Sequence, residues 1–194
     1  MRPRLVVMLK EPLPGRVKTR LGREIGMTGA AFWFRHQVAR LLREIADPRW
    51  HCVLAVSPDR AGLSSRVWPA QFARIPQGGG DLGARMARQL ASHPGPVLII
   101  GADIPGITRA HIAKAFAVLG RKDFVLGPAG DGGYWAIGAR NLGRPLPKTL
   151  FSNTRWSTQY ALADTLASLG SASHGLCATL DDVDTLDDLR RLKH

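Results

Sequence analysis

Short apolar segments alternate with helical patterns along this chain, and this alternation constrains the fold more than any other feature. The continuous apolar runs at residues 5–9 and 97–100 are typical of strands buried on both faces. Between residues 28 and 45, apolar residues instead recur at helical spacing. Further strands are expected at 50–56, 72–75, 123–126, 134–137 and 176–180, and further helices from Asp81, Thr108, Ser157 and about Thr185. The order predicts an α/β fold, with a mostly parallel sheet covered on both faces.

Size and composition favour one ordered domain spanning residues 1–194. The chain has 194 residues, of which 45% are hydrophobic, which is enough for one complete core. No apolar run approaches the ~20 residues that span a bilayer, so no membrane partner is expected. The start has only about five apolar residues and no small-residue cleavage site, so it is not expected to be a signal peptide, and two cysteines make no disulfide framework. These features predict a reduced, cytoplasmic location.

The net charge of +12 raises the question of a nucleic-acid partner. Most of the excess is arginine, scattered over helix faces and loops without a run of five or six. No nucleic-acid motif or aromatic-rich stripe accompanies these arginines. A basic nucleic-acid-binding or regulatory module is therefore the less favoured interpretation, and attraction of anionic small substrates fits the charge as well.

A basic loop follows the first strand and has the residue types of a phosphate site. Two prolines delay the next helix and a glycine lets the chain turn before three closely spaced cations. Arginine can grip phosphate oxygens bidentately and lysine adds a compact charge, and a short helix opened near Thr19 would add free amides. The predicted nucleotide- and phosphate-binding residues are Lys10, Pro12, Gly15 and Arg16, with Lys18 and Arg20 as catalytic residues that stabilise the leaving group. The alternative is a solvated basic loop.

Two carboxylates stand where later strands end. Asp103 follows the apolar run at 97–100, and a divalent metal ion, Mg²⁺ or Mn²⁺, bridging two phosphates is a natural partner for it. The alternative is a turn-forming Asp before Pro105. Asp131 lies in a loop with four glycines, which let the backbone approach a ligand closely. We expect Asp131 to bind the metal or to accept a hydroxyl proton from an acceptor, with Gly132, Gly133 and Tyr134 facing the substrate.

Three weaker candidates remain open on sequence grounds. Gly79, Gly80 and Asp81 are candidates for a nucleotide-facing loop, although Asp81 as a mere helix cap is an equal alternative. Trp156 is a candidate for stacking on a sugar or base, or else a core residue. The acidic stretch 181–188 is interpreted mainly as a negatively charged helix start, with a metal role as the lesser alternative.

These motifs resemble a known family. KEPLPGRVKTRLG (10–22), GGGDLGARM (78–86), GADIPGIT (101–108), GPAGDGGYWAIG (127–138), RWST (155–158) and DDVDTLDDL (181–189) are similar, in order, to motifs of the bacterial radical-SAM/selenodomain-associated transferases of the arsenosugar-biosynthesis group. The resemblance implies a three-layer α/β/α sandwich of the GT-A, nucleotide-diphospho-sugar transferase kind. It also implies a glycosyltransferase that uses a nucleotide sugar and a small-molecule acceptor.

Two departures from the family pattern are visible, and one alternative reaction stays open. The chain has a single Asp103 where typical GT-A glycosyltransferases have Asp-x-Asp, and Gly130 stands where relatives often carry an acidic residue. The basic first loop is also similar to that of guanylyltransferases, where it holds a triphosphate. A nucleotidyltransferase that consumes a nucleoside triphosphate and releases pyrophosphate is therefore the alternative.

Overall fold

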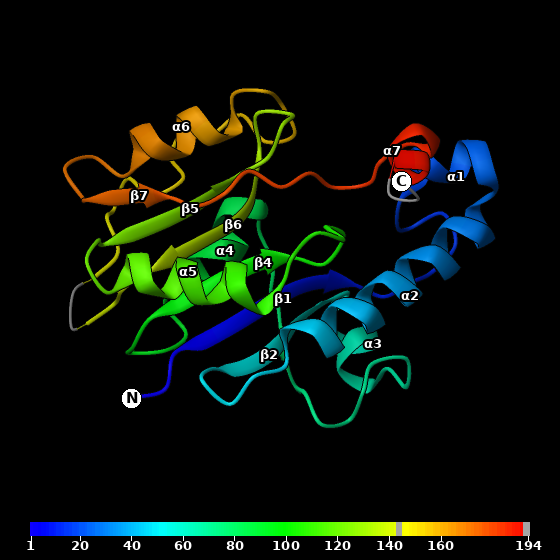
Figure 1. The fold of residues 1–194 in the computed structure, drawn as a ribbon, viewed down its shortest axis with the longest axis horizontal. Helices are drawn as coiled ribbons and strands as arrows, with labels where there is room; N and C mark the ends of the chain where they lie inside the picture. Colours follow the sequence, from blue (N-terminus) through cyan, green and yellow to red (C-terminus); the bar gives the residue numbers. More distant parts are fainter. Residues whose placement is uncertain (143–144, 192–194) are drawn as a thin grey trace.

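A seven-stranded mixed sheet forms the centre of the molecule (Figure 1). The computed structural model describes residues 1–142 and 145–191. The strands are β1 (Arg4–Lys10), β2 (His51–Ser57), β3 (Ala73–Pro76), β4 (Val97–Gly101), β5 (Phe124–Pro128), β6 (Tyr134–Ala139) and β7 (His174–Leu176), in the spatial order β3-β2-β1-β4-β6-β5-β7. Only β6 runs antiparallel to its neighbours, β4 and β5. The predicted mostly parallel sheet is confirmed, as is the strand that folds back at 134–137.

Helices cover both faces of this sheet and give the expected three layers. They are α1 (Thr19–Ile25), α2 (Met27–Ile45), α3 (Asp59–Ser64), α4 (Leu82–Leu90), α5 (Arg109–Leu119), α6 (Ala161–Ser168) and α7 (Leu186–Arg191). Alternate residues of β1 enter different cores: Leu5 and Val7 pack with residues of α2 and α5, whereas Val6 packs with residues of α4 and α6. Because the middle of β1 is buried on both faces, its side chains from residue 5 to residue 9 are apolar, as the sequence indicated.

The C-terminal segment departs from the sequence-based expectation in two places. The expected strand at 176–180 is wrong in its bounds, because β7 ends at Leu176 and the chain then leaves the sheet. It crosses the end of the sheet and reaches α7, which lies beside α1 (Figure 1). The amide of Leu180 still donates to the carbonyl of Pro128 at 3.1 Å, so the start of this crossing segment is held to the end of β5.

The helix expected from Ser157 begins later, at Ala161. Ser157 has a φ of 60°, a left-handed conformation that is incompatible with the first turn of a helix. The guanidinium of Arg155 clamps both oxygens of Asp164, at 2.8 and 2.9 Å, and so fixes the turn that precedes α6. Residue 157 is thereby left in the loop, facing the carboxyl ends of the central strands.

The short helix α3 was not expected, since residues 59–64 carry no clear helical apolar pattern. No helix in the described part of the chain is both long and apolar enough to cross a membrane.

Candidate active site

The basic loop joins the end of β1 to α1 and directs Lys18 into the molecule. Lys18 is the residue before α1 and has a φ of 45°, a left-handed conformation that non-glycine residues seldom adopt. The side chain of Lys18 is only 5% exposed, whereas that of Arg20 is 69% exposed. The loop therefore buries one cation, Lys18, and leaves others at the surface.

The ammonium group of Lys18 contacts three carboxylates from distant parts of the chain. Its Nζ atom lies 2.7 Å from Oδ2 of Asp103 and 2.7 Å from Oδ1 of Asp184, and 3.4 Å from Oδ2 of Asp182. Arg20 adds a second contact to Asp184, at 3.1 Å. The predicted convergence of the basic loop with Asp103 is therefore present at atomic distance.

The pKa values of this cluster reflect its crowded charges. Burial alone lowers the pKa of Lys18, but the charge and hydrogen bond of Asp103, followed by those of Asp184, raise it above the ordinary value. Burial raises the pKa of Asp182 to about 6; Lys18 opposes this rise and the nearby Asp184 and Asp103 add to it. Burial acts in the same direction on Asp184, but there Lys18 and Arg20 outweigh it and hold the pKa below its usual range.

A cleft of about 640 Å³ opens over this cluster at the carboxyl ends of β1 and β4. We call it the cationic cleft; its polar lining residues include Lys10, Arg16, Lys18, Arg20, Gln77, Asp103, Asp182 and Asp184. In open α/β sheets, ligands bind at the carboxyl ends of the strands, and these cations lie at that position.

A second hollow of about 290 Å³ adjoins the cationic cleft, because both are lined by Asp103 and Asp182. We call it the apolar pocket; its lining includes Met86, Ile99, Ile137, Ala129, Asp131, Gly133, Tyr134, Trp135 and Trp156. The sequence-predicted Asp131, Gly133, Tyr134 and Trp156 are thus brought together here with Asp103.

The loop between β5 and β6 places Asp131 at this pocket. Gly132 has a φ of +83°, and a β-carbon there would collide with the backbone carbonyl of Gln159, so only glycine fits. The carbonyl of Gly132 accepts the amide of Leu162 at 3.0 Å, which ties the loop to α6. Oδ1 of Asp131 accepts the amide of Gly133 at 2.8 Å. Asp131 is exposed and has no ion-pair partner within residues 1–142 and 145–191.

Tyr134 and Trp156 are held by contacts behind the pocket. The hydroxyl of Thr165 donates to the hydroxyl oxygen of Tyr134 at 3.3 Å, and the ring of Trp156 packs on Phe151 with centroids 5.6 Å apart. Trp156 therefore packs on a core residue and also lines the pocket, and its stacking on a sugar or base stays a prediction.

Of the two alternatives for the segment after β3, the structure shows the helix cap. Asp81 accepts the amide of Ala84 at 2.8 Å and caps α4, while Arg88 donates to the carbonyl of Gly79 at 3.2 Å. Gly79, Gly80 and Asp81 do not line either hollow, whereas the preceding Gln77 does. In the loop after β1, Pro12 and Gly15 likewise shape the chain without lining the cleft.

Asp182 and Asp184 are the site residues that the sequence interpretation undervalued. Their acidic stretch indicated a helix start, and Thr185 and Asp188 do cap α7 reciprocally: the hydroxyl of Thr185 accepts the amide of Asp188 at 3.2 Å, and the carboxylate of Asp188 accepts the amide of Thr185 at 2.9 Å. The signal that could have identified the other two is the number of carboxylates, since one helix start needs fewer than this stretch supplies.

The chemistry of this cluster fits a divalent cation that also binds phosphate. No group of three or more His, Cys, Asp or Glu side chains among the described residues is arranged to hold a metal ion alone. However, among the described residues these three carboxylates contact two cations, Lys18 and Arg20, so their negative charges outnumber their cationic partners by one. Mg²⁺ is commonly held by one or two carboxylates together with substrate phosphates, and Asp103 and Asp182 at the boundary of the two hollows meet that requirement.

Several solved structures have a fold similar to that of this protein. A protein of Desulfovibrio desulfuricans assigned to the nucleotide-diphospho-sugar transferases is 30% identical, with a TM-score of 0.84 over 98% of this chain and 86% of that one. Glucosyl-3-phosphoglycerate synthase from Mycobacterium tuberculosis, in complex with Mn²⁺, UDP and glucosyl-3-phosphoglycerate, is 14% identical with a TM-score of 0.57, over 97% of this chain and 74% of that one. 4-Diphosphocytidyl-2C-methyl-D-erythritol synthase from Anaerococcus prevotii is 9% identical with a TM-score of 0.62, over 99% of this chain and 96% of that one.

The protein thus has the GT-A-like fold of the nucleotide-diphospho-sugar transferases. Residues 41–158 match the bacterial family DUF2064, described as an uncharacterized protein conserved in bacteria, and the chain belongs to that family. None of the curated proteins matches this chain. At the general level, the neighbours are transferases that act on nucleotides or nucleotide sugars.

Proposed function

We propose that the protein is a metal-assisted glycosyltransferase that moves a sugar from a nucleotide diphosphate to a small acceptor, as its resemblance to the arsenosugar-biosynthesis group implies. The observation that carries the proposal is the contact of Lys18 with Asp103, 85 positions along the chain, on the wall of a cleft that also contains Lys10, Arg16 and Arg20. Cations and a strand-end carboxylate at one sheet edge are the groups that a metal-bound diphosphate requires.

Each residue has a role that follows from its position. Lys18 and Arg20 would hold the diphosphate and stabilise the charge that develops on it, a mainly electrostatic contribution. A divalent cation, Mg²⁺ or Mn²⁺, held by Asp103 and Asp182, would supply further neutralisation of that charge when bound. Lys10, the last residue of β1, and Arg16, in the basic loop, are both exposed and would attract and orient the nucleotide.

In the proposed reaction, the two adjoining hollows hold the acceptor and the donor, and the sugar is transferred in a single displacement. An acceptor oxygen in the apolar pocket forms a bond to the anomeric carbon of the sugar, and the bond from that carbon to the diphosphate oxygen breaks. The electron pair leaves with the diphosphate in the cationic cleft. The hydroxyl proton of the acceptor passes to the carboxylate of Asp131, which lines the pocket and has no competing ion pair among the described residues.

The Asp103→Ala variant tests the metal-dependent part of this proposal. It should abolish Mg²⁺- or Mn²⁺-dependent binding of a nucleoside diphosphate while the protein stays folded, because the metal loses its strand-end ligand. Isothermal titration calorimetry with UDP and GDP, with and without metal, measures this. Glu44→Ala is the matched control, since it removes an exposed carboxylate on α2. Unchanged metal-dependent affinity in Asp103→Ala would contradict the proposal.

A nucleotidyltransferase is the second candidate, and the number of cations in the cleft favours it. Lys10, Arg16, Lys18 and Arg20 all line the cationic cleft, and a triphosphate would use more of this charge than a diphosphate. Incubation with nucleoside triphosphates and a pyrophosphate assay separates the two reactions. Pyrophosphate release in the presence of an acceptor would favour nucleotidyl transfer, and release of a nucleoside diphosphate from a nucleotide sugar would favour glycosyl transfer.

A further inference from the structure

Charge is segregated between the two adjoining hollows. Four cations line the cationic cleft, whereas no Lys, Arg or His from the described ranges 1–142 and 145–191 lines the apolar pocket. The ionisable residues of the pocket are Asp103, Asp131, Asp182 and Tyr134. The molecule carries +12 overall, so this pocket has the opposite charge to its surroundings.

The carboxylates of the pocket have unequal partners. Asp103 and Asp182 contact Lys18 from the cleft side. Asp131 has only the backbone amide of Gly133, and its side of the pocket contains no cation among the described residues. An anionic group beside Asp131 would therefore meet no counter-charge from a described side chain on that side of the pocket, and it would lose its water to bind there.

The rest of the lining is apolar and leaves little space. The lining residues include Met86, Ile99, Ile137, Trp135 and Trp156. The volume of about 290 Å³ lies at the lower end of the range for small-molecule sites. Such a wall favours a compact apolar body, and its aromatic rings also tolerate a nearby cation.

From these observations we infer, on the basis of the transferase function proposed above, that the acceptor is a compact compound with an apolar body and no negative charge. It is an alcohol that is uncharged or carries a cationic group. Phosphorylated and carboxylated acceptors are excluded by Asp131, and the apolar wall provides the affinity. The charge of the pocket thus keeps the donor phosphates in the cationic cleft and admits the acceptor to the other side of Asp103.

Three ring compounds of similar size test this inference: benzyl alcohol, benzylamine, which is protonated at neutral pH, and benzoate. Binding is measured by quenching of tryptophan fluorescence and by saturation-transfer NMR, and only binding that benzyl alcohol displaces counts as binding in the pocket. We expect benzyl alcohol and benzylamine to bind at least about tenfold more tightly than benzoate. The positive charge of the whole protein would attract benzoate, so this preference would come from the pocket itself.

Asp131→Asn should reduce the discrimination against benzoate, because the amide keeps an acceptor for the Gly133 amide and removes the charge. Asp187→Asn is the matched control; it removes an exposed carboxylate on α7, whose side chain is 73% exposed, and should leave the preference unchanged. Tight benzoate binding in the pocket, or no probe binding there at all, would overturn the inference. The rise in melting temperature on adding a nucleoside diphosphate and Mg²⁺ is measured in parallel. If this rise is absent, the proposed transferase function fails; if it is present and the pocket binds benzoate tightly, only the inference about the acceptor fails.

Discussion

At the scale of single residues, Lys18 is the side chain on which the site depends. It is almost fully buried and is the shared partner of Asp103, Asp182 and Asp184. Its left-handed backbone conformation is an unusual feature that persists only where surrounding contacts fix it. The structure therefore uses Lys18 to hold the basic loop against the carboxyl end of β4 and the C-terminal segment.

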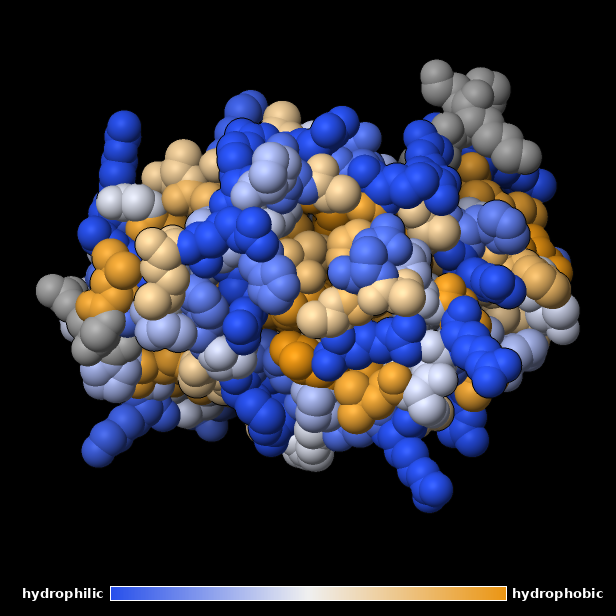
Figure 2. Space-filling model, turned by 90° about the horizontal axis from the view of Figure 1, so that it is seen from below, coloured by the Kyte–Doolittle hydropathy of each residue, from blue (hydrophilic) through white to orange (hydrophobic). Residues whose placement is uncertain are grey.

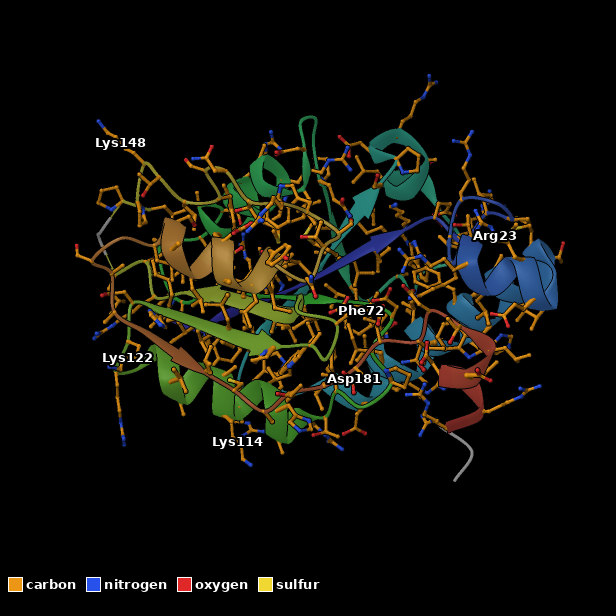
Figure 3. All side chains as sticks on the ribbon, turned by 90° about the horizontal axis from the view of Figure 1, so that it is seen from above. Arg23, Phe72, Lys114, Lys122, Lys148 and Asp181 are labelled. Carbon is orange, nitrogen blue, oxygen red and sulfur yellow. The ribbon has the colours of Figure 1, made fainter. Side chains whose placement is uncertain are left out.

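Replacing Lys18 with Met should destabilise the protein, because three carboxylates would then lie close together with only Arg20 nearby. Removing one partner of a fully buried ion pair costs 3–5 kcal/mol, but these carboxylates are about one-third exposed, so we expect about 1–3 kcal/mol. Urea denaturation measures the change in the free energy of unfolding. Lys114→Met is the control, since Lys114 is exposed on α5 and projects outward (Figure 3). An equal effect of the two substitutions would show that the ion pairs contribute nothing.

At the scale of elements, the β5–β6 loop is the part of the site that local backbone geometry determines most strictly. Gly132 combines a positive φ with a close approach to the backbone carbonyl of Gln159. The amide of Leu162 donates to the carbonyl of Gly132. Asp131 precedes it directly, so any movement of this turn relocates the carboxylate at the pocket. The loop and the start of α6 therefore behave as one structural unit.

Gly132→Ala should lower the free energy of unfolding by about 2–4 kcal/mol, because the positive φ and the collision with Gln159 both oppose a β-carbon. Gly170→Ala isolates the first of these effects. Gly170 has a φ of +59° and nothing within 4 Å of the added carbon, so about 1 kcal/mol is expected there. Thermal and urea unfolding of both variants gives the comparison. Similar losses at the two sites would mean that the loop shifts at no cost.

The sequence predicted the strands and caps whose signals are local. It did not predict the features that depend on contacts between residues far apart in the chain. The buried strands β1 and β4 and the capping of α4 by Asp81 follow from apolar runs and one side chain beside a helix start. The late start of α6 depends instead on the Arg155–Asp164 clamp. The contacts of Asp182 and Asp184 with Lys18 join residues 164 and 166 positions apart, and no local pattern encodes such a pairing.

At the scale of the whole molecule, the cations that give the charge of +12 are dispersed along the chain rather than gathered into one run. Hydrophilic side chains are spread over the face seen in Figure 2, with apolar ones between them. Lys114, Lys122 and Lys148 project into solvent away from α1 and α7 (Figure 3). Where cations do gather, in the cationic cleft, Lys18 and Arg20 already contact carboxylates. A long polyanion would meet scattered charges outside the cleft and, within it, two cations that already contact carboxylates.

Double-stranded DNA should accordingly bind only in the non-specific range of about 10⁻⁴–10⁻⁶ M at physiological salt, with affinity falling steeply as salt rises. Nucleoside diphosphate binding in the presence of metal should depend less on salt, because the pairs in the cleft are partly buried and less screened. Fluorescence anisotropy with labelled DNA and calorimetry with the nucleotide, over the same salt series, measure both slopes. DNA that bound more tightly than this range and displaced the nucleotide would show that the cleft is a nucleic-acid site. The carboxylates of Asp103, Asp182 and Asp184 oppose that outcome, since without a metal ion they repel phosphate.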